Sequence, residues 1–388
     1  MLNYGYENRT RLIFGRDTEK QIGELVKPYA DKVLLVYGGG SIKRNGLYDT
    51  VVASLENAGI VWTELAGIKP NPRLDKVHEG VKLCKENGIG FILAVGGGSV
   101  IDTAKSIAAG ALYDGDAWDF YTGKEITEAL PIATILTIPA TGSESSVNAV
   151  ITNEATRQKF GIGSELLRPV FSILNPALCT SLSREQLAPG VFDIMSHTLE
   201  RYFTPNDHTD LTDELCEGLL RATMRNGLRL MRDTSDYNAW AEIMQAGNLS
   251  HNGQMGMGRA QDWANHPMEH ELSALYDVPH GAGLAVTTIA WMKYVYKKHL
   301  PMFVQFAVNV MGVKGALRQQ EEIAWEGILA LEDFCRKMNL PVRMDELGIG
   351  EENLELMAQK CVGDGVLGGL ESLNVHDIVA IYRLACEA

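Results

Sequence analysis

The chain has 388 residues, of which 46% are hydrophobic and 22% charged, so it is long and apolar enough to bury more than one core. The formal net charge of −14 argues against nucleic acid and anionic membrane surfaces as partners. No basic segment leads into an apolar one at the N-terminus, and no window approaches the ~20 apolar residues that span a bilayer. The six cysteines are scattered singly, which predicts a cytoplasmic protein with reduced thiols.

The first part of the chain alternates short apolar runs with amphipathic stretches, the pattern of strands and helices in turn. The apolar runs are rich in branched residues and predict strands of a parallel sheet that is buried on both faces. Helical patterns lie between them, each close after a Gly or Pro. The predicted strands are 32–37, 91–95, 132–137 and 170–174, and the predicted helices are 43–58, 73–87 and 99–110.

Beyond Asn175-Pro176 the strand pattern disappears, and apolar residues recur at helical spacing. We therefore predict an α/β domain over residues 1–178 and an all-helical domain over 179–388, both within the usual size of a domain. The longest helical segments are expected at 209–231, 237–250, 283–310 and 319–337.

Two of the predicted strands end in a triple glycine followed by serine and a helix. Bare backbone at a strand end, with a helix N-terminus behind it, suits the binding of a phosphate. Neither run completes the G-x-G-x-x-G fingerprint, because its sixth position is Ile42 in one and Ile101 in the other. Two such loops in one domain nevertheless favour a dinucleotide that touches both. The loops are Gly38-Gly39-Gly40-Ser41 and Gly96-Gly97-Gly98-Ser99.

The first loop also bears on the choice of cofactor. Enzymes that use NAD hold the ribose 2′-hydroxyl with a carboxylate, whereas a 2′-phosphate needs a nearby cation. The run from Tyr37 to Asn45 contains no acid but contains Lys43 and Arg44, which favours NADP. A third polar segment, 137–146, follows the strand at 132–137 and extends the same ligand-facing edge.

Six of the nine histidines lie between His197 and His280. Asp193 and His197 are four residues apart, so they project from one face of a helix and can reach one ion. His266 and His270 repeat this spacing, and His280 adds a further imidazole. Spacing alone does not choose among His266, His270 and His280.

One carboxylate with several imidazoles suits iron or zinc better than calcium or magnesium, which prefer shells of oxygen. A metalloprotease would carry a glutamate directly after the first His of H-x-x-x-H, but Pro267 stands there. A hydrolase is therefore disfavoured. Glu269 points about 100° away from His270 on an ideal helix and is expected to support the site.

These motifs resemble those of the iron-containing alcohol dehydrogenase family, in particular its NADPH-dependent butanol dehydrogenases and broad-range aldehyde reductases. The similarity covers essentially the whole chain. It implies an N-terminal dinucleotide-binding α/β domain, a helical C-terminal domain and a metal in the cleft between them. The motifs are G-G-G-S-x-x-D-x-A-K at 96–105, P-x-T-G-S-E at 139–144, D-x-x-x-H at 193–197, and H-P-x-x-H with P-H-G within 266–281.

The resemblance also implies residue roles. Asp193, His197, His266 and His280 match the ligands of Fe²⁺ or Zn²⁺, while His270 and Asp102 are the candidate catalytic residues. Asn71 and Asn148 match positions near the substrate. The positions expected to bind NADP(H) are Gly38, Gly39, Gly40, Ser41, Lys43, Gly97, Gly98, Ser99, Asp102, Thr137, Thr141, Ser146 and Lys159.

The leading hypothesis is a metal-dependent oxidoreductase that transfers hydride between NADP(H) and primary alcohols or aldehydes, working mainly as an aldehyde reductase. The family further implies a homodimer. The alternative is a lyase of the dehydroquinate synthase type, whose phosphate-bearing, carboxylated substrate calls for several Lys or Arg residues near the metal. Arg259 is the only Lys or Arg residue between positions 245 and 290. A binding protein that had lost its chemistry would have lost a metal ligand, and all four are present.

Overall fold

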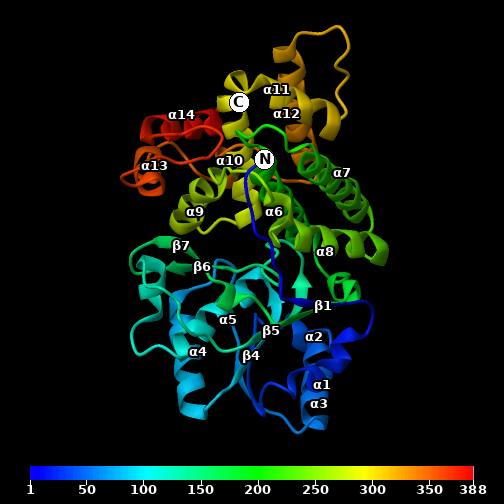
Figure 1. The fold of residues 1–388 in the computed structure, drawn as a ribbon, viewed down its shortest axis with the longest axis vertical. Helices are drawn as coiled ribbons and strands as arrows, with labels where there is room; N and C mark the ends of the chain where they lie inside the picture. Colours follow the sequence, from blue (N-terminus) through cyan, green and yellow to red (C-terminus); the bar gives the residue numbers. More distant parts are fainter. Residues whose placement is uncertain (388) are drawn as a thin grey trace. The chain divides into compact units, whose positions relative to one another are not determined.

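The protein was analysed as a computed structural model that describes residues 1–387. The chain forms two compact units. One is Glu7–Leu182, and the other contains Met1–Tyr6 together with the chain from Ser183 onward. The first unit is built on a parallel sheet and the second is helical (Figure 1), so the predicted fold class is confirmed.

The first unit contains a six-stranded sheet of order β1-β8-β5-β4-β2-β3, in which every pair is parallel. All four strands predicted from sequence occur. A separate antiparallel hairpin, β6–β7, was not predicted, and neither were β1 and β3, whose side chains are partly exposed. The strands are β1 (Arg11–Phe14), β2 (Lys32–Tyr37), β3 (Val61–Leu65), β4 (Phe91–Gly97), β5 (Ile132–Ile138), β6 (Asn148–Asn153), β7 (Gln158–Gly163) and β8 (Phe171–Leu174).

Helices cover both faces of this sheet, which explains its nearly continuous apolar strands. On one face, α1 (Ile22–Val26) and α3 (Leu47–Asn57) pack against alternate strand residues such as Leu35 and Leu93. On the other, α5 (Gly98–Ala111) packs against β4 and β5, and α4 (Leu74–Asn87) packs against α5.

The prediction of one continuous helix over 43–58 is wrong. The segment is divided into α2 (Ser41–Arg44) and α3, because Gly46, the residue before α3, has φ +81 and interrupts the helical backbone. This left-handed conformation is one that glycine adopts without strain.

In the second unit, the segment predicted as one helix at 283–310 is also interrupted. Its first part ends at Val295, and a new helix starts at Leu300-Pro301, where the proline ring suits a first turn and could not continue the earlier helix. The helices are α6 (Arg184–Tyr202), α7 (Asp210–Arg232), α8 (Tyr237–His251), α9 (Asn265–Tyr276), α10 (His280–Val295), α11 (Leu300–Gln305), α12 (Gln320–Lys337), α13 (Leu354–Val362) and α14 (Val375–Cys386).

Helices α6 and α10 take part in the most extensive packing of this unit. Helix α10 packs against α6, α9 and α14, and Trp291 of α10 meets Phe203 edge-on at 5.4 Å between ring centroids. The packing of these helices brings the start of α10 to the middle of α6. Within residues 1–387, no helix combines the length and apolar character needed to cross a bilayer.

Candidate metal centre and cofactor-binding edge

One face of α6 carries the first part of the candidate metal centre. Asp193, His197 and Glu200 follow each other at i, i+4 and i+7, so they line one stripe of the helix. All three are almost completely buried, between 2% and 3% exposed. Charged and imidazole groups are rarely buried in such numbers without partners or a ligand.

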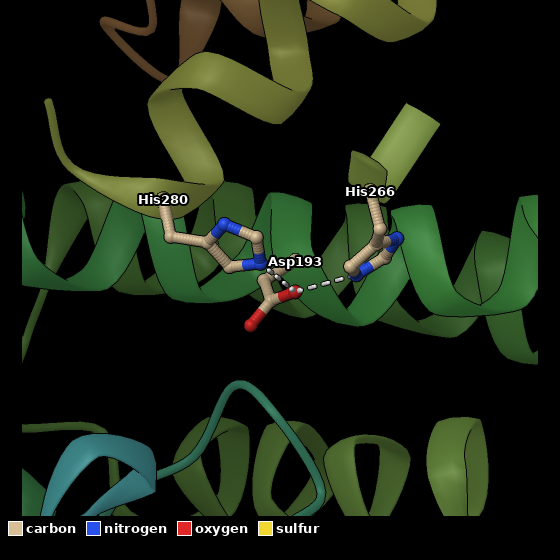
Figure 2. Close-up of side chains that lie close together, drawn as sticks. All are labelled: Asp193, His266 and His280. Atoms are coloured by element: carbon tan, nitrogen blue, oxygen red, sulfur yellow. Dashed lines mark ion pairs between the residues drawn. The ribbon is translucent and has the colours of Figure 1, made fainter. Parts of the chain in front are cut away.

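Three imidazoles surround the carboxylate of Asp193. Its Oδ1 lies 3.2 Å from Nδ1 of His197, 3.8 Å from Nε2 of His280 and 3.9 Å from Nε2 of His266. Figure 2 shows the His266 and His280 rings reaching toward this oxygen from separate elements. They come from α9 and from the first residue of α10. The structure thus brings together the four residues that the family resemblance implies as ligands, and their binding of a metal stays a prediction.

Two further carboxylates hold the rings of His266 and His280 from behind. Nδ1 of His266 bonds to Glu200, and Nδ1 of His280 bonds to Glu269. Glu200 also accepts the backbone N–H of Asn265 at 2.8 Å and that of His266 at 3.1 Å. Each of these bonds orients its imidazole so that Nε2, the nitrogen nearest Asp193, points into the cluster.

Sequence reasoning missed Glu200. The signal that could have found it is its position on the same helical stripe as Asp193 and His197. Glu269 does lie beside the site, where the sequence predicted a supporting role.

Burial and neighbouring charges set the ionisation of this cluster. Burial, together with the adjacent imidazoles, holds the pKa of His197 well below its usual value. Burial also disfavours the charged form of His266, but Glu200 outweighs this effect and raises the pKa of His266. Nε2 of His197 and Nε2 of His266 are only 3.1 Å apart.

This donor set fits a divalent transition metal. The ligand atoms of Asp193, His266 and His280 all lie within 4.8 Å of one another, and His197 contacts two of the three. Imidazole nitrogens with one carboxylate oxygen match the preference of iron or zinc. His270 lies beside the cluster, with its ring centroid 5.7 Å from that of His280. Among residues 1–387, a second group of possible ligands, Glu269, His270 and His280, shares a residue with the first.

A close helix contact fixes the position of His280. A Cβ on the next residue, Gly281, would lie 2.0 Å from the backbone oxygen of Pro189 in α6. Glycine therefore allows the start of α10 to touch the backbone of α6 one turn before Asp193. The backbone of α6 limits where His280 can lie.

In the first unit, the second glycine loop meets the polar segment after β5. Gly98 begins α5, and a Cβ there would lie 2.5 Å from the Thr141 side chain. The first glycine loop follows β2, and the second spans the end of the neighbouring parallel strand β4 and the start of α5. Both loops thus leave the carboxyl edge of the sheet, where ligands of open α/β sheets bind.

A buried lysine ties α5 to this polar segment. Nζ of Lys105 donates to Ser143 Oγ at 2.9 Å, to the carbonyl of Ser146 at 2.9 Å and to the carbonyl of Asn148 at 2.8 Å. Asp102, one turn earlier, accepts from Ser143 Oγ at 2.6 Å and from the Val150 N–H at 3.0 Å. Burial lowers the pKa of Lys105 to about 8.

The structure thus shows Asp102 holding the 143–150 segment, and its catalytic role stays a prediction. A predicted cofactor-binding residue, Lys159, contacts a predicted substrate-side residue, Asn71: its Nζ donates to Oδ1 of Asn71 at 3.1 Å. Thr137 lies within β5, where its carbonyl accepts the Cys179 thiol at 3.4 Å.

A parallel sheet with two glycine loops and an Asp-His₃ cluster fit an oxidoreductase that uses a nicotinamide cofactor and a divalent metal. The chain belongs to the iron-containing alcohol dehydrogenase family. The model for iron-containing alcohol dehydrogenase matches residues 9–176, and the model for the C-terminal part of the family matches residues 187–386.

Several relatives match over nearly the full length. A probable NADH-dependent butanol dehydrogenase of Bacillus subtilis is 45% identical, with 99% of each chain covered. The NADPH-dependent aldehyde reductase YqhD of Escherichia coli is 33% identical, with 99% of this chain and 100% of that protein covered. The crystal structure of an NADH-dependent butanol dehydrogenase A from Thermotoga maritima is 43% identical and has a TM-score of 0.96, covering 100% of this chain and 99% of that one.

Replacing Lys105 by Met should lower the free energy of unfolding by about 1–3 kcal/mol, because several buried acceptors lose their donor. It should also weaken the binding of adenine nucleotides through the loosened 143–148 segment. Denaturant unfolding and calorimetric titration measure the two effects. Lys85→Met is the control, since Lys85 bonds to a backbone carbonyl at the surface. Unchanged stability and affinity in Lys105→Met would contradict the assigned role.

Gly281→Ala should reduce metal affinity, because the new methyl group meets the α6 backbone and displaces His280 from Asp193. Metal content after dialysis and the melting temperature both report on this change. Gly218→Ala in α7 is the matched control, since a Cβ there comes no closer than 3.9 Å to a neighbour and alanine favours a helix. Equal metal retention in both variants would show that the contact does not position His280.

Glu269→Gln should weaken metal binding by about 10–100-fold, the usual effect of removing a group that orients a ligating histidine. Competition with a chromogenic chelator measures the dissociation constant directly. The exposed Glu214 offers a control with the same change of charge. An affinity equal to that of Glu214→Gln would rule out an orienting role.

Proposed function

We propose that this enzyme reduces short-chain primary aldehydes, such as butanal, with NADPH, and oxidises the corresponding alcohols in the reverse direction. The observation that carries the proposal is the Asp193 cluster, in which buried carboxylates hold two imidazoles with Nε2 toward one oxygen. The substrate class is supported by relatives named butanol dehydrogenase and aldehyde reductase.

Asp193, His197, His266 and His280 would hold the metal. The bound metal supplies a Lewis acid for the substrate oxygen, and the nicotinamide supplies or accepts the hydride. Reduction also consumes a proton. His270 lies close to His280 and is half-buried, so we propose that its ring relays this proton from solvent.

For the cofactor, Lys43 and Arg44 follow the first glycine loop, and no acid lies between Tyr37 and Asn45. A cation at this position suits a 2′-phosphate. Relatives carry names of both kinds, NADH-dependent and NADPH-dependent. The use of NADPH, a homodimer and a cytoplasmic location are the parts of the proposal that rest on sequence reasoning.

The alternative lyase receives no support from Arg259. Its guanidinium is buried and donates to Asp213, to the carbonyl of Thr209 at 3.1 Å and to that of Arg201 at 3.1 Å. These bonds occupy the one Lys or Arg between 245 and 290, which a phosphate-bearing substrate would need.

We expect the purified protein, loaded with Fe²⁺ or Zn²⁺, to oxidise NADPH in the presence of butanal, and chelation to abolish this activity. His280→Ala should lose both metal and activity while its circular dichroism stays unchanged. The assay compares NADH with NADPH over aldehydes from propanal to hexanal. No cofactor consumption with any of them after metal loading would refute the proposal, and full metal retention in His280→Ala would contradict the ligand set.

A further inference from the structure

Glu64 lies at the carboxyl edge of the sheet, beside the first glycine loop. It belongs to β3, which runs parallel to β2 with Leu35 opposite Glu64. The chain after β3 then bonds to the loop region, since the Gly67 N–H donates to the carbonyl of Gly38 at 3.1 Å and the Ile68 N–H to that of Tyr37 at 3.3 Å. Glu64 is therefore close in space to a loop from which it is distant in sequence.

The carboxylate of Glu64 gathers three donors from the elements around this loop. Tyr37 at the end of β2 donates to it at 2.5 Å, Tyr48 in α3 also donates to it, and Nζ of Lys43 in α2 lies 3.1 Å away. Lys43 also lies over the Tyr48 ring, 4.3 Å from its centroid. The Glu64 side chain is 35% exposed and that of Lys43 is 47% exposed, so both can reach a ligand.

The order of the strands and loops along the chain suggests a function for the contact between Glu64 and Lys43. In dinucleotide-binding βαβ units, a glycine loop follows one strand, and an acid at the end of the next strand, about 20 residues on, bonds to the ribose 2′-hydroxyl. Here the loop follows β2, and the next strand along the chain carries Glu64. The run from Tyr37 to Asn45 lacks an acid, but the fold supplies one from the adjacent strand.

We propose that Glu64 sets the cofactor preference, because it competes with a 2′-phosphate for Lys43 and offers its carboxylate to a 2′-hydroxyl. This inference rests on the proposed nicotinamide-dependent function. NADPH binding then requires Lys43 to exchange Glu64 for the phosphate. The Glu64–Lys43 pair therefore lowers the binding of NADPH relative to that of NADH.

Calorimetric titration of the metal-loaded protein tests this with two fragments, adenosine 2′,5′-bisphosphate and 5′-AMP, which differ only in the 2′-phosphate. Glu64→Gln removes the competing charge and keeps the size of the side chain. We expect it to tighten the bisphosphate relative to 5′-AMP by about tenfold, the effect of one added charge-assisted hydrogen bond. The ratio of kcat/KM for NADPH over NADH should rise in parallel.

Two variants make the result specific. Glu79→Gln removes the same charge from another glutamate that pairs with a lysine, Lys76, at 2.7 Å, and it should leave the fragment ratio unchanged. Adding Lys43→Met to Glu64→Gln should cancel the gain. A ratio that does not rise in Glu64→Gln, or that rises equally in Glu79→Gln, overturns the role of Glu64. Failure of the wild-type protein to bind either fragment would instead overturn the nicotinamide-dependent function itself, and this inference with it.

Discussion

The candidate metal centre depends on one kind of interaction, the hydrogen bond between a buried carboxylate and Nδ1 of a histidine. Glu200 fixes His266, and Glu269 fixes His280. Each bond pairs a carboxylate that would be costly to bury alone and turns Nε2 toward Asp193. The residues come from α6, α9 and α10, so the packing of these three helices determines the geometry of the site. The glycine at 281 belongs to the same arrangement, because it admits α10 to the backbone of α6.

Much of the fold and part of the candidate metal centre could be predicted from the sequence. The buried strands were evident because helices cover both faces of the sheet and leave their sequences almost wholly apolar. The pair Asp193 and His197 was evident because helical spacing is a local property. Strand β3 was missed because its mixed polar sequence, Val61–Leu65, lies at the sheet edge. The break in the helix predicted at 283–310 required weighing Pro301 against a continuous apolar pattern.

The contacts that sequence could not predict join residues far apart in the chain. Glu200 bonds to His266 across 66 positions, and Lys105 reaches Ser146 across 41. Glu64 shows the functional consequence most clearly. The first glycine loop itself contains no acid, whereas the parallel pairing of β2 and β3 brings Glu64 to Lys43. Charge near a cofactor site is set by sheet order as well as by local sequence, and a net charge of −14 says nothing about it.

The most direct test of the account is X-ray absorption spectroscopy of the protein loaded with one equivalent of Fe²⁺ or Zn²⁺. The account predicts a shell of nitrogen and oxygen atoms at about 2.0–2.2 Å, with the outer scattering of three imidazole rings. It further predicts that one ring contribution disappears in His280→Ala reconstituted at high metal concentration. A sulfur atom at about 2.3 Å, or a shell of oxygen atoms without imidazole scattering, would contradict a site built on Asp193 and three histidines.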